Sequence, residues 1–268
     1  VDYSADVPIG SNILKQISDV YRKVRNTSRY LLGNIYDFDY QNDSIDICEL
    51  PLLDKWMLNR TAEVIDEITY AFSNFEFSRF FQTIQNFCVV DLSNFYLDIA
   101  KDRLYVSSKS DFRRRSCQTV LSLVIETISG LIAPVLCHMA EDIWQNIPYE
   151  LEEASVFQKG WPKAPKTWRN NSLNDHVTEL RKLRTVINRM LESCRNNQEL
   201  GSSLESSVRV DIHDEKVQAA IEWLSQSEFN KVDVLRDWFL VSSLQIGGEP
   251  WAEVLVSENN DIASVEIA

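Results

Sequence analysis

The 268-residue chain contains few residues that break or cross-link a polypeptide: seven Gly, seven Pro and five Cys. This low content of Gly and Pro argues against long disordered or repetitive segments. The cysteines are odd in number, are widely spaced and form no Cys-x-x-Cys pair. This pattern argues against a zinc knuckle and indicates reduced thiols in a cytoplasmic protein. We expect one large globular domain or two ordinary ones.

The sequence also lacks a long uninterrupted apolar run. Its longest apolar stretch, residues 121–137, is interrupted by Glu126, Gly130 and Pro134 and falls short of a membrane span. The first ten residues show neither a secretory signal nor an initiator methionine. We therefore expect no membrane partner, a cytoplasmic location and a fragment of a longer chain.

Recognisable catalytic motifs are missing as well. No glycine-rich phosphate loop occurs, and His138, His176 and His213 have no nucleophile or carboxylate at a motif spacing. Each histidine is interpreted as an ordinary surface or core residue. Cys137 and His138 point about 100° apart on a helix, so they do not share a metal ion without further ligands. The sequence predicts no catalytic residue, metal site or cofactor in this chain.

Acidic residues are in excess, but they are unevenly distributed. The formal net charge is −13, and residues 199–268 carry −10 of it, which leaves −3 for residues 1–198. Basic residues gather in residues 22–29, in the run Arg113–Arg115 and in residues 181–195. The negative total therefore does not exclude a nucleic-acid partner, whose phosphates require local positive charge.

The first basic cluster lies on a predicted helix over residues 12–32, which ends at Gly33. Apolar residues recur there at three, four or seven positions, the period of a helix with one buried face. At about 100° per residue, Arg22, Arg25 and Arg29 fall within about 60° of one another beside that face. They are either a phosphate-binding line or a solvated helix flank, which is common on bundle helices.

The remaining periodicity predicts a mostly α protein: a helical bundle followed by a small α/β module. We expect the bundle over residues 1–165, a long helix and connection over 166–206, and the acidic module, truncated, over 207–268. Further helices are predicted over 51–75, 76–105, 111–132, 173–194 and 214–226, with a shorter one that follows Pro134 and ends near Trp144. Strands are predicted over 208–212, 238–246 and 251–257.

Longer motifs occur in a distinctive order along the whole chain. They are "DVPIGSNILKQISDVYRKVRNTSRYLLGNIYDFD", "NFCVVDLSNFYLDIAKDRLY", "LIAPVLCHMAEDIW", "SVFQKGWP", "LGSSLESSV" and "FLVSSLQI". Together they closely resemble the anticodon-binding region that follows the catalytic core of bacterial-type isoleucyl-tRNA synthetases, which are class Ia enzymes. The "RKVRNTSRYLLGN" and "GSSLE" motifs look particular to the isoleucyl enzymes, whereas the Glu-Asp-Ile-Trp motif is similar to related enzymes too.

The resemblance implies a helical anticodon-binding bundle that holds isoleucine tRNA. The parent would be an isoleucine–tRNA ligase, which attaches isoleucine to its tRNA using ATP and also requires magnesium and zinc. The family's ATP-binding motifs and cysteine-rich zinc tail are absent from this chain, so we expect the fragment alone to be inactive. Its expected partners are isoleucine tRNA and the catalytic and editing domains of the same monomeric protein.

Charge and helical phase provide the candidate tRNA contacts. Arg22, Arg25 and Arg29 are expected to contact phosphates near the junction with the catalytic core. Further candidates along the helical surface are Lys101, Arg103, Arg181 and Arg184. Two alternatives stay open: a helical scaffold that binds no tRNA by itself, and the corresponding region of a valyl- or leucyl-tRNA synthetase.

Overall fold

The computed structural model describes residue 6 and residues 9–227 and 234–268. The chain forms two compact units, residues 1–170 and 171–268. The first is helical and the second combines helices with a small sheet, so the predicted fold class is confirmed. Among the described residues, no helix has the length and apolar character needed to cross a membrane. The division into 1–165, 166–206 and 207–268 stays a prediction.

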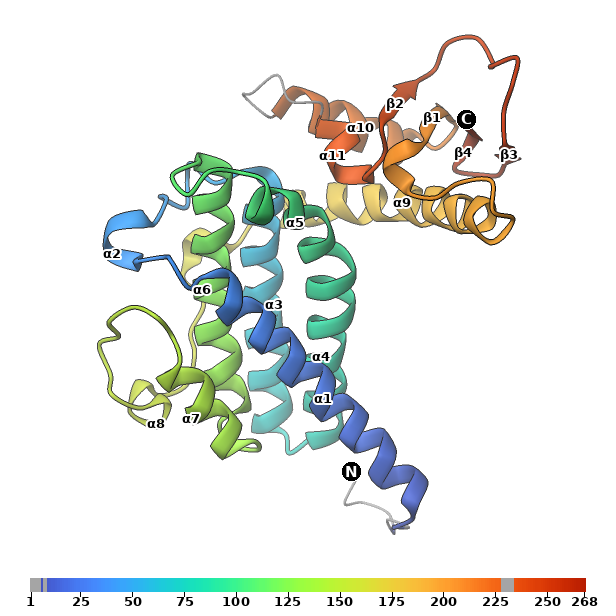
Figure 1. Cartoon of the computed structure of the whole chain (residues 1–268). Coiled ribbons are helices and arrows are strands. Elements are labelled where there is room, and N and C mark those ends of the chain that lie inside the picture. Colours follow the sequence, from blue (N-terminus) through green and yellow to red (C-terminus); the bar gives the residue numbers. More distant parts are fainter. Residues whose placement is uncertain (1–5, 7–8, 228–233) are drawn as a thin grey trace. The chain divides into compact units, whose positions relative to one another are not determined.

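The first unit is a helical bundle in which α3, α4 and α6 lie side by side and α1 crosses them (Figure 1). Its elements are α1 (Ser11–Asn34), α2 (Tyr40–Asp43), α3 (Leu52–Ser73), α4 (Phe77–Asn86), η1 (Phe87–Tyr96), α5 (Leu97–Tyr105), α6 (Phe112–Ile132), α7 (Cys137–Gln145), α8 (Val156–Lys159) and η2 (Lys166–Trp168). The long predicted helices of this unit are confirmed.

Helix α6 forms the centre of the bundle. It is buried around most of its circumference and contacts α1, α3, α5 and α7. The sequence reflects this position, because Leu121, Val124 and Ile128 are fully buried while small residues such as Ser122 and Ser129 cover the other sides. Their hydroxyls donate hydrogen bonds to backbone carbonyls of the same helix, so they are buried without unsatisfied polar groups.

The segment predicted as one helix over 76–105 is continuous, but its middle part, η1, is a π-helix. A π-helix has i→i+5 hydrogen bonds and winds more slowly than an α-helix. The spacing of three, four and three residues would place Asp91, Asn94, Asp98 and Lys101 on one face of a regular α-helix, and this expectation from the sequence is wrong because the α-helical period fails here. Asp91 is buried and pairs with Arg60 of α3 at 2.9 Å, whereas Asp98 and Lys101 pair with each other at 3.0 Å.

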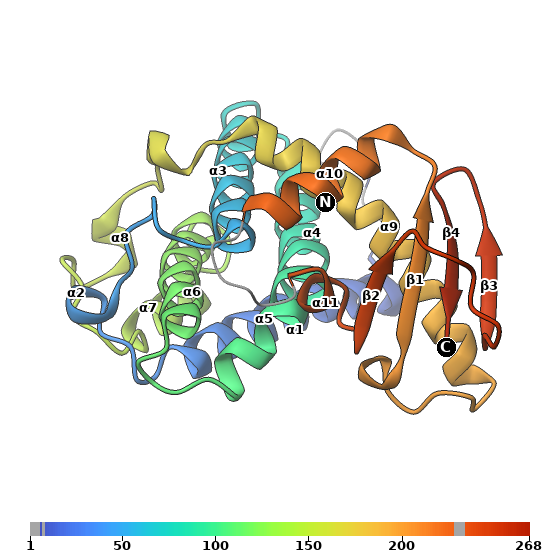
Figure 2. The ribbon, with the colours of Figure 1, turned by 90° about the horizontal axis from the view of Figure 1, so that it is seen from above.

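The second unit is a four-stranded sheet with helices on one face (Figure 2). It contains α9 (Asn171–Asn196), η3 (Ser203–Glu205), β1 (Ser207–Ile212), α10 (Glu215–Ser227), α11 (Val234–Phe239), β2 (Ser243–Ile246), β3 (Val256–Asn259) and β4 (Ala263–Ile267). The strand order is β2-β1-β4-β3, with β1 parallel to β2 and antiparallel to β4. Helices α9 and α10 pack against each other and on the sheet.

Two strand predictions need correction. The segment 238–246 is a strand only from Ser243, because Trp238 and Phe239 are adjacent and both buried, which suits the end of α11 and not an alternating strand. Likewise, 251–257 is a strand only from Val256. The last strand, β4, is absent from the prediction, although its alternating buried residues carry the signal of a half-buried strand.

Candidate nucleic-acid interface

The three arginines of the predicted phosphate-binding line are exposed on α1. Val20, Val24 and Leu31 are buried on the opposite side, so packing of α1 on the bundle turns Arg22, Arg25 and Arg29 toward solvent. Arg22 is paired with Asp19 at 2.7 Å, and its side chain is 64% exposed. Such a surface pair is worth about 0 to 1 kcal/mol, so it does not prevent a phosphate from replacing the carboxylate.

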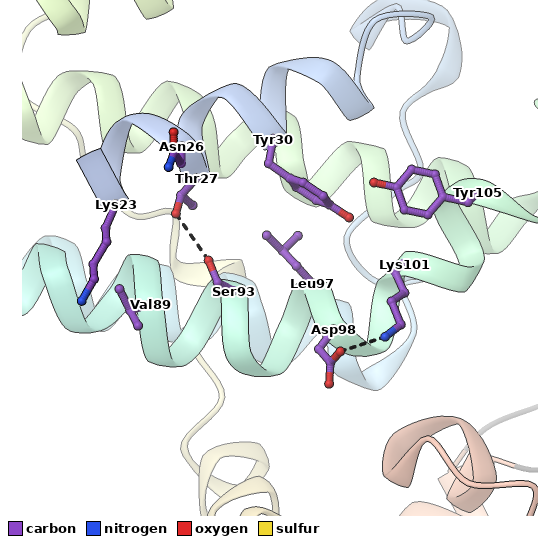
Figure 3. Close-up of a pocket in the computed structure, with 10 residues that line it drawn as sticks. All are labelled: Lys23, Asn26, Thr27, Tyr30, Val89, Ser93, Leu97, Asp98, Lys101 and Tyr105. Atoms are coloured by element: carbon purple, nitrogen blue, oxygen red, sulfur yellow. Dashed lines mark hydrogen bonds and ion pairs between the residues drawn. The ribbon is translucent and has the colours of Figure 1, made fainter. Parts of the chain in front are cut away.

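A groove of about 500 Å³ lies beside this line, between α1 and the continuous η1–α5 segment (Figure 3). Its lining residues are Lys23, Asn26, Thr27, Tyr30, Val89, Ser93, Leu97, Asp98, Lys101 and Tyr105. The two walls touch where the hydroxyls of Thr27 and Ser93 lie 3.4 Å apart. Residues about sixty to eighty positions apart in the sequence thus build one surface feature.

The π-helix explains how one wall of the groove is straight. Val89, Ser93, Leu97, Lys101 and Tyr105 recur every four residues. In a regular α-helix each step of four would rotate the side chain by about 40° further around the axis. Because η1 turns through fewer degrees per residue, its steps offset the forward rotation in α5, and all five residues line the same groove.

Aromatic and basic side chains occur together in this groove. The phenol groups of Tyr30 and Tyr105 face each other from the two walls, and Figure 3 places Lys23 toward the other end. Burial and the neighbouring Tyr105 hydroxyl raise the pKa of Tyr30, so its phenol stays protonated and able to donate a hydrogen bond. The arrangement offers stacking surface, hydrogen-bonding groups and positive charge within one site.

Of the weaker candidates on the bundle, Lys101 lines the groove and Arg103 does not. The predicted surface position of Arg103 is wrong: the side chain is 4% exposed and its Nη1 lies 3.2 Å from the Asp54 carboxylate. On the regular helix α5, Arg103 lies about 200° around the axis from Lys101 and four residues after the buried Ile99, so it faces the core and not the groove. A phosphate does not reach that position.

The two candidates in the second unit also differ. Arg181 is half-buried on α9. Arg184 is buried and donates a hydrogen bond to the carbonyl oxygen of Trp238, so its predicted surface position is wrong. Position 184 falls among the buried Leu183 and Ile187 on α9, where the long side chain satisfies a backbone carbonyl of α11.

Sequence reasoning missed most of the groove. Lys23, Asn26 and Tyr30 recur at helical spacing on α1, and this was a readable signal for a second polar line. On the other wall, the signal is the spacing of four residues from Val89 to Tyr105, which carries meaning only once the π-helix is known. Across the part of the chain that the structure describes, no group of three or more His, Cys, Asp or Glu fits a metal ion.

Comparison with known proteins identifies the class of this fold. Residues 54–212 match the family described as the anticodon-binding domain of tRNA ligase, and the chain belongs to that family. The predicted resemblance is thereby confirmed.

Among its relatives, isoleucine–tRNA ligases of Prochlorococcus marinus strains NATL1A and NATL2A are 89% and 88% identical over all 268 residues. The isoleucine–tRNA ligase of Synechococcus sp. strain CC9311 is 63% identical over the same length. In each case the alignment covers 100% of this chain and 28% of the relative, so the chain spans little more than a quarter of the relatives' length.

Proposed function

We propose that this chain is the anticodon-binding part of an isoleucine–tRNA ligase and binds isoleucine tRNA along the exposed side of α1. The observation that carries the proposal is the line of exposed arginines, Arg22, Arg25 and Arg29, on α1. This helix precedes the residues that match the anticodon-binding family, 54–212, and packs on α4, η1, α6 and α7 within them. Guanidinium groups bind phosphate through several hydrogen bonds in a fixed geometry, and arginine is therefore suited to this role.

The local charge supports tRNA as the ligand despite the acidic total. In the described residues, Arg25 and Arg29 form no ion pair, so their charge is available to a phosphate backbone. Lys101 of the groove and the half-buried Arg181 are secondary contacts in the proposal. The module over 207–268 carries most of the negative charge and is assigned no broad phosphate contact.

In the longer protein, tRNA binding by this part would serve a reaction elsewhere. We infer an enzyme that attaches isoleucine to its tRNA with ATP, magnesium and zinc, acting as a cytoplasmic monomer. Binding energy gained far from the reacting atoms positions a substrate and so affects the rate as well as the affinity. The described residues offer no group that fits a metal ion, and the proposed role of this chain uses none.

A titration of the 268-residue chain with tRNA tests the proposal. Isoleucine tRNA and a tRNA for another amino acid are compared by fluorescence anisotropy at moderate salt. We expect saturable binding that is tighter for isoleucine tRNA. Equal affinity for the two tRNAs would contradict the assignment to isoleucine tRNA, which rests on the names of the relatives. The absence of binding would favour the second candidate, a scaffold whose tRNA affinity depends on the rest of the protein.

A further inference from the structure

We propose that the groove between α1 and the η1–α5 segment takes one unpaired nucleobase of the tRNA, stacked on Tyr105. The proposal rests on the proposed function, because its ligand is part of the same tRNA. The groove volume of about 500 Å³ lies in the range of pockets that hold small organic groups. A base in a double helix is stacked on both faces and paired along one edge, so only an unpaired base is free to enter.

The aromatic side chains supply the main contact surface. Tyr105 is 64% exposed at the end of α5, and its ring is accessible from solvent. Tyr30 approaches it from α1, which gives the groove an aromatic end (Figure 3). Stacking on an aromatic ring suits any of the four bases, because every base has a π-face.

Polar groups at the rim match the remaining parts of a nucleotide. Asn26, Ser93 and Asp98 present amide, hydroxyl and carboxylate groups that can donate to or accept from a base edge. Lys23 and Lys101 lie in different parts of the groove, as Figure 3 shows. Their ammonium groups can therefore neutralise phosphates on the two sides of an inserted nucleotide.

The path of the RNA backbone is consistent with the phosphate-binding line. On α1, Asn26 lies between Arg22 and Tyr30 around the helix axis, at about 40° from each. A backbone held by the arginines thus passes the rim of the groove. The straight wall made by η1 and α5 extends the contact beyond the length of one α-helical turn.

The test combines affinity with a map of base accessibility. Isoleucine tRNA is titrated into wild type, Tyr105→Ala, Tyr105→Phe and the control Tyr70→Ala. Tyr70 is 52% exposed near the end of α3 and does not line the groove. Each complex is then treated with dimethyl sulfate and a carbodiimide, which modify the pairing edges of unpaired bases. We expect Tyr105→Ala to weaken binding by about tenfold and to expose one base that wild type protects.

Tyr105→Phe keeps the ring and is expected to retain that protection, as is Tyr70→Ala. Wild-type affinity and an unchanged protection map in Tyr105→Ala would overturn the groove proposal while leaving tRNA binding by α1 intact. A weakened Tyr105→Ala with no newly exposed base would overturn it too. If wild type binds no tRNA, the proposed function fails first, and this result is distinct from a failure of the groove alone.

Discussion

Arg114 holds Asp37 through two parallel hydrogen bonds, Nη1 to Oδ2 and Nη2 to Oδ1, each 2.9 Å long. The pair joins the segment after α1 to the first turn of α6, and both side chains are nearly buried. Arg115 adds bonds to the backbone oxygen of Asp37 and to the carboxylate of Asp43. Two members of the basic run 113–115 therefore stabilise the bundle internally, and a basic run in a sequence does not by itself mark a nucleic-acid contact.

This ion pair predicts a specific loss of stability in acid. The Arg114 hydrogen bond lowers the pKa of Asp37 from 3.8 to about 2. Since the folded pKa lies below the unfolded one, the stabilisation is complete above about pH 4 and is lost as the pH falls toward about 2. We expect the free energy of unfolding of Asp37→Asn to be about 1 to 2 kcal/mol lower than that of wild type at neutral pH. Urea unfolding measured from pH 7 to about pH 2 should show that the free energies of unfolding of the variant and of wild type converge as the pH falls. A difference that stays constant over this range would contradict the prediction.

The buried pair of Asp54 and Arg103 predicts a structural and not an RNA-binding phenotype. Asp54 is fully buried, accepts a hydrogen bond of 2.5 Å from Tyr96, and has a raised pKa because of its burial. Removing Arg103 leaves this carboxylate without its charge partner. We expect Arg103→Met to cost about 3 to 5 kcal/mol of stability in urea unfolding.

The matched control is the Asp54→Asn/Arg103→Met double variant, which removes both charges and should cost less than Arg103→Met alone. If Arg103 contacts phosphate instead, the folded double variant would lose tRNA affinity and salt sensitivity. We expect neither loss.

The turn between α3 and α4 offers a stabilising substitution. Phe75 has φ 58° in the left-handed region, and the following amide of Glu76 bonds to the carbonyl of Ala71 at 2.7 Å. This is a helix ending that favours glycine. We expect Phe75→Gly to stabilise the chain by about 1 kcal/mol in thermal unfolding. Phe75→Ala keeps the Cβ and loses the ring contact with Phe77, so a similar gain in that variant would contradict the backbone explanation.

The sequence predicts the helices well because their apolar period is long and regular. Helix α1 is an example, since its buried and exposed sides follow directly from the spacing of Val24, Leu31 and the arginines. The burial of Arg103 follows from the same period, since it lies four residues after the buried Ile99 on α5. The alignment of Val89 with Tyr105 could not be predicted, because the π-helix changes the angle between successive residues. The groove depends on that alignment, and it further requires that α1 pack beside η1, a contact between segments far apart in the sequence.

The central claim is that the exposed side of α1 contacts tRNA phosphates, and the salt dependence of binding tests it most directly. The 268-residue chain, an Arg22/Arg25/Arg29→Ala variant and a Lys159/Lys163/Lys166→Ala control are titrated with isoleucine tRNA over a range of salt concentrations. The control removes the same charge from exposed positions on and after α8.

Each lost phosphate contact should flatten the plot of log affinity against log salt by about 0.7 to 0.9. We predict weaker binding and a slope reduced by about 2 to 3 in the arginine variant, with the control close to wild type. An arginine variant whose affinity and slope both equal those of wild type would contradict the claim.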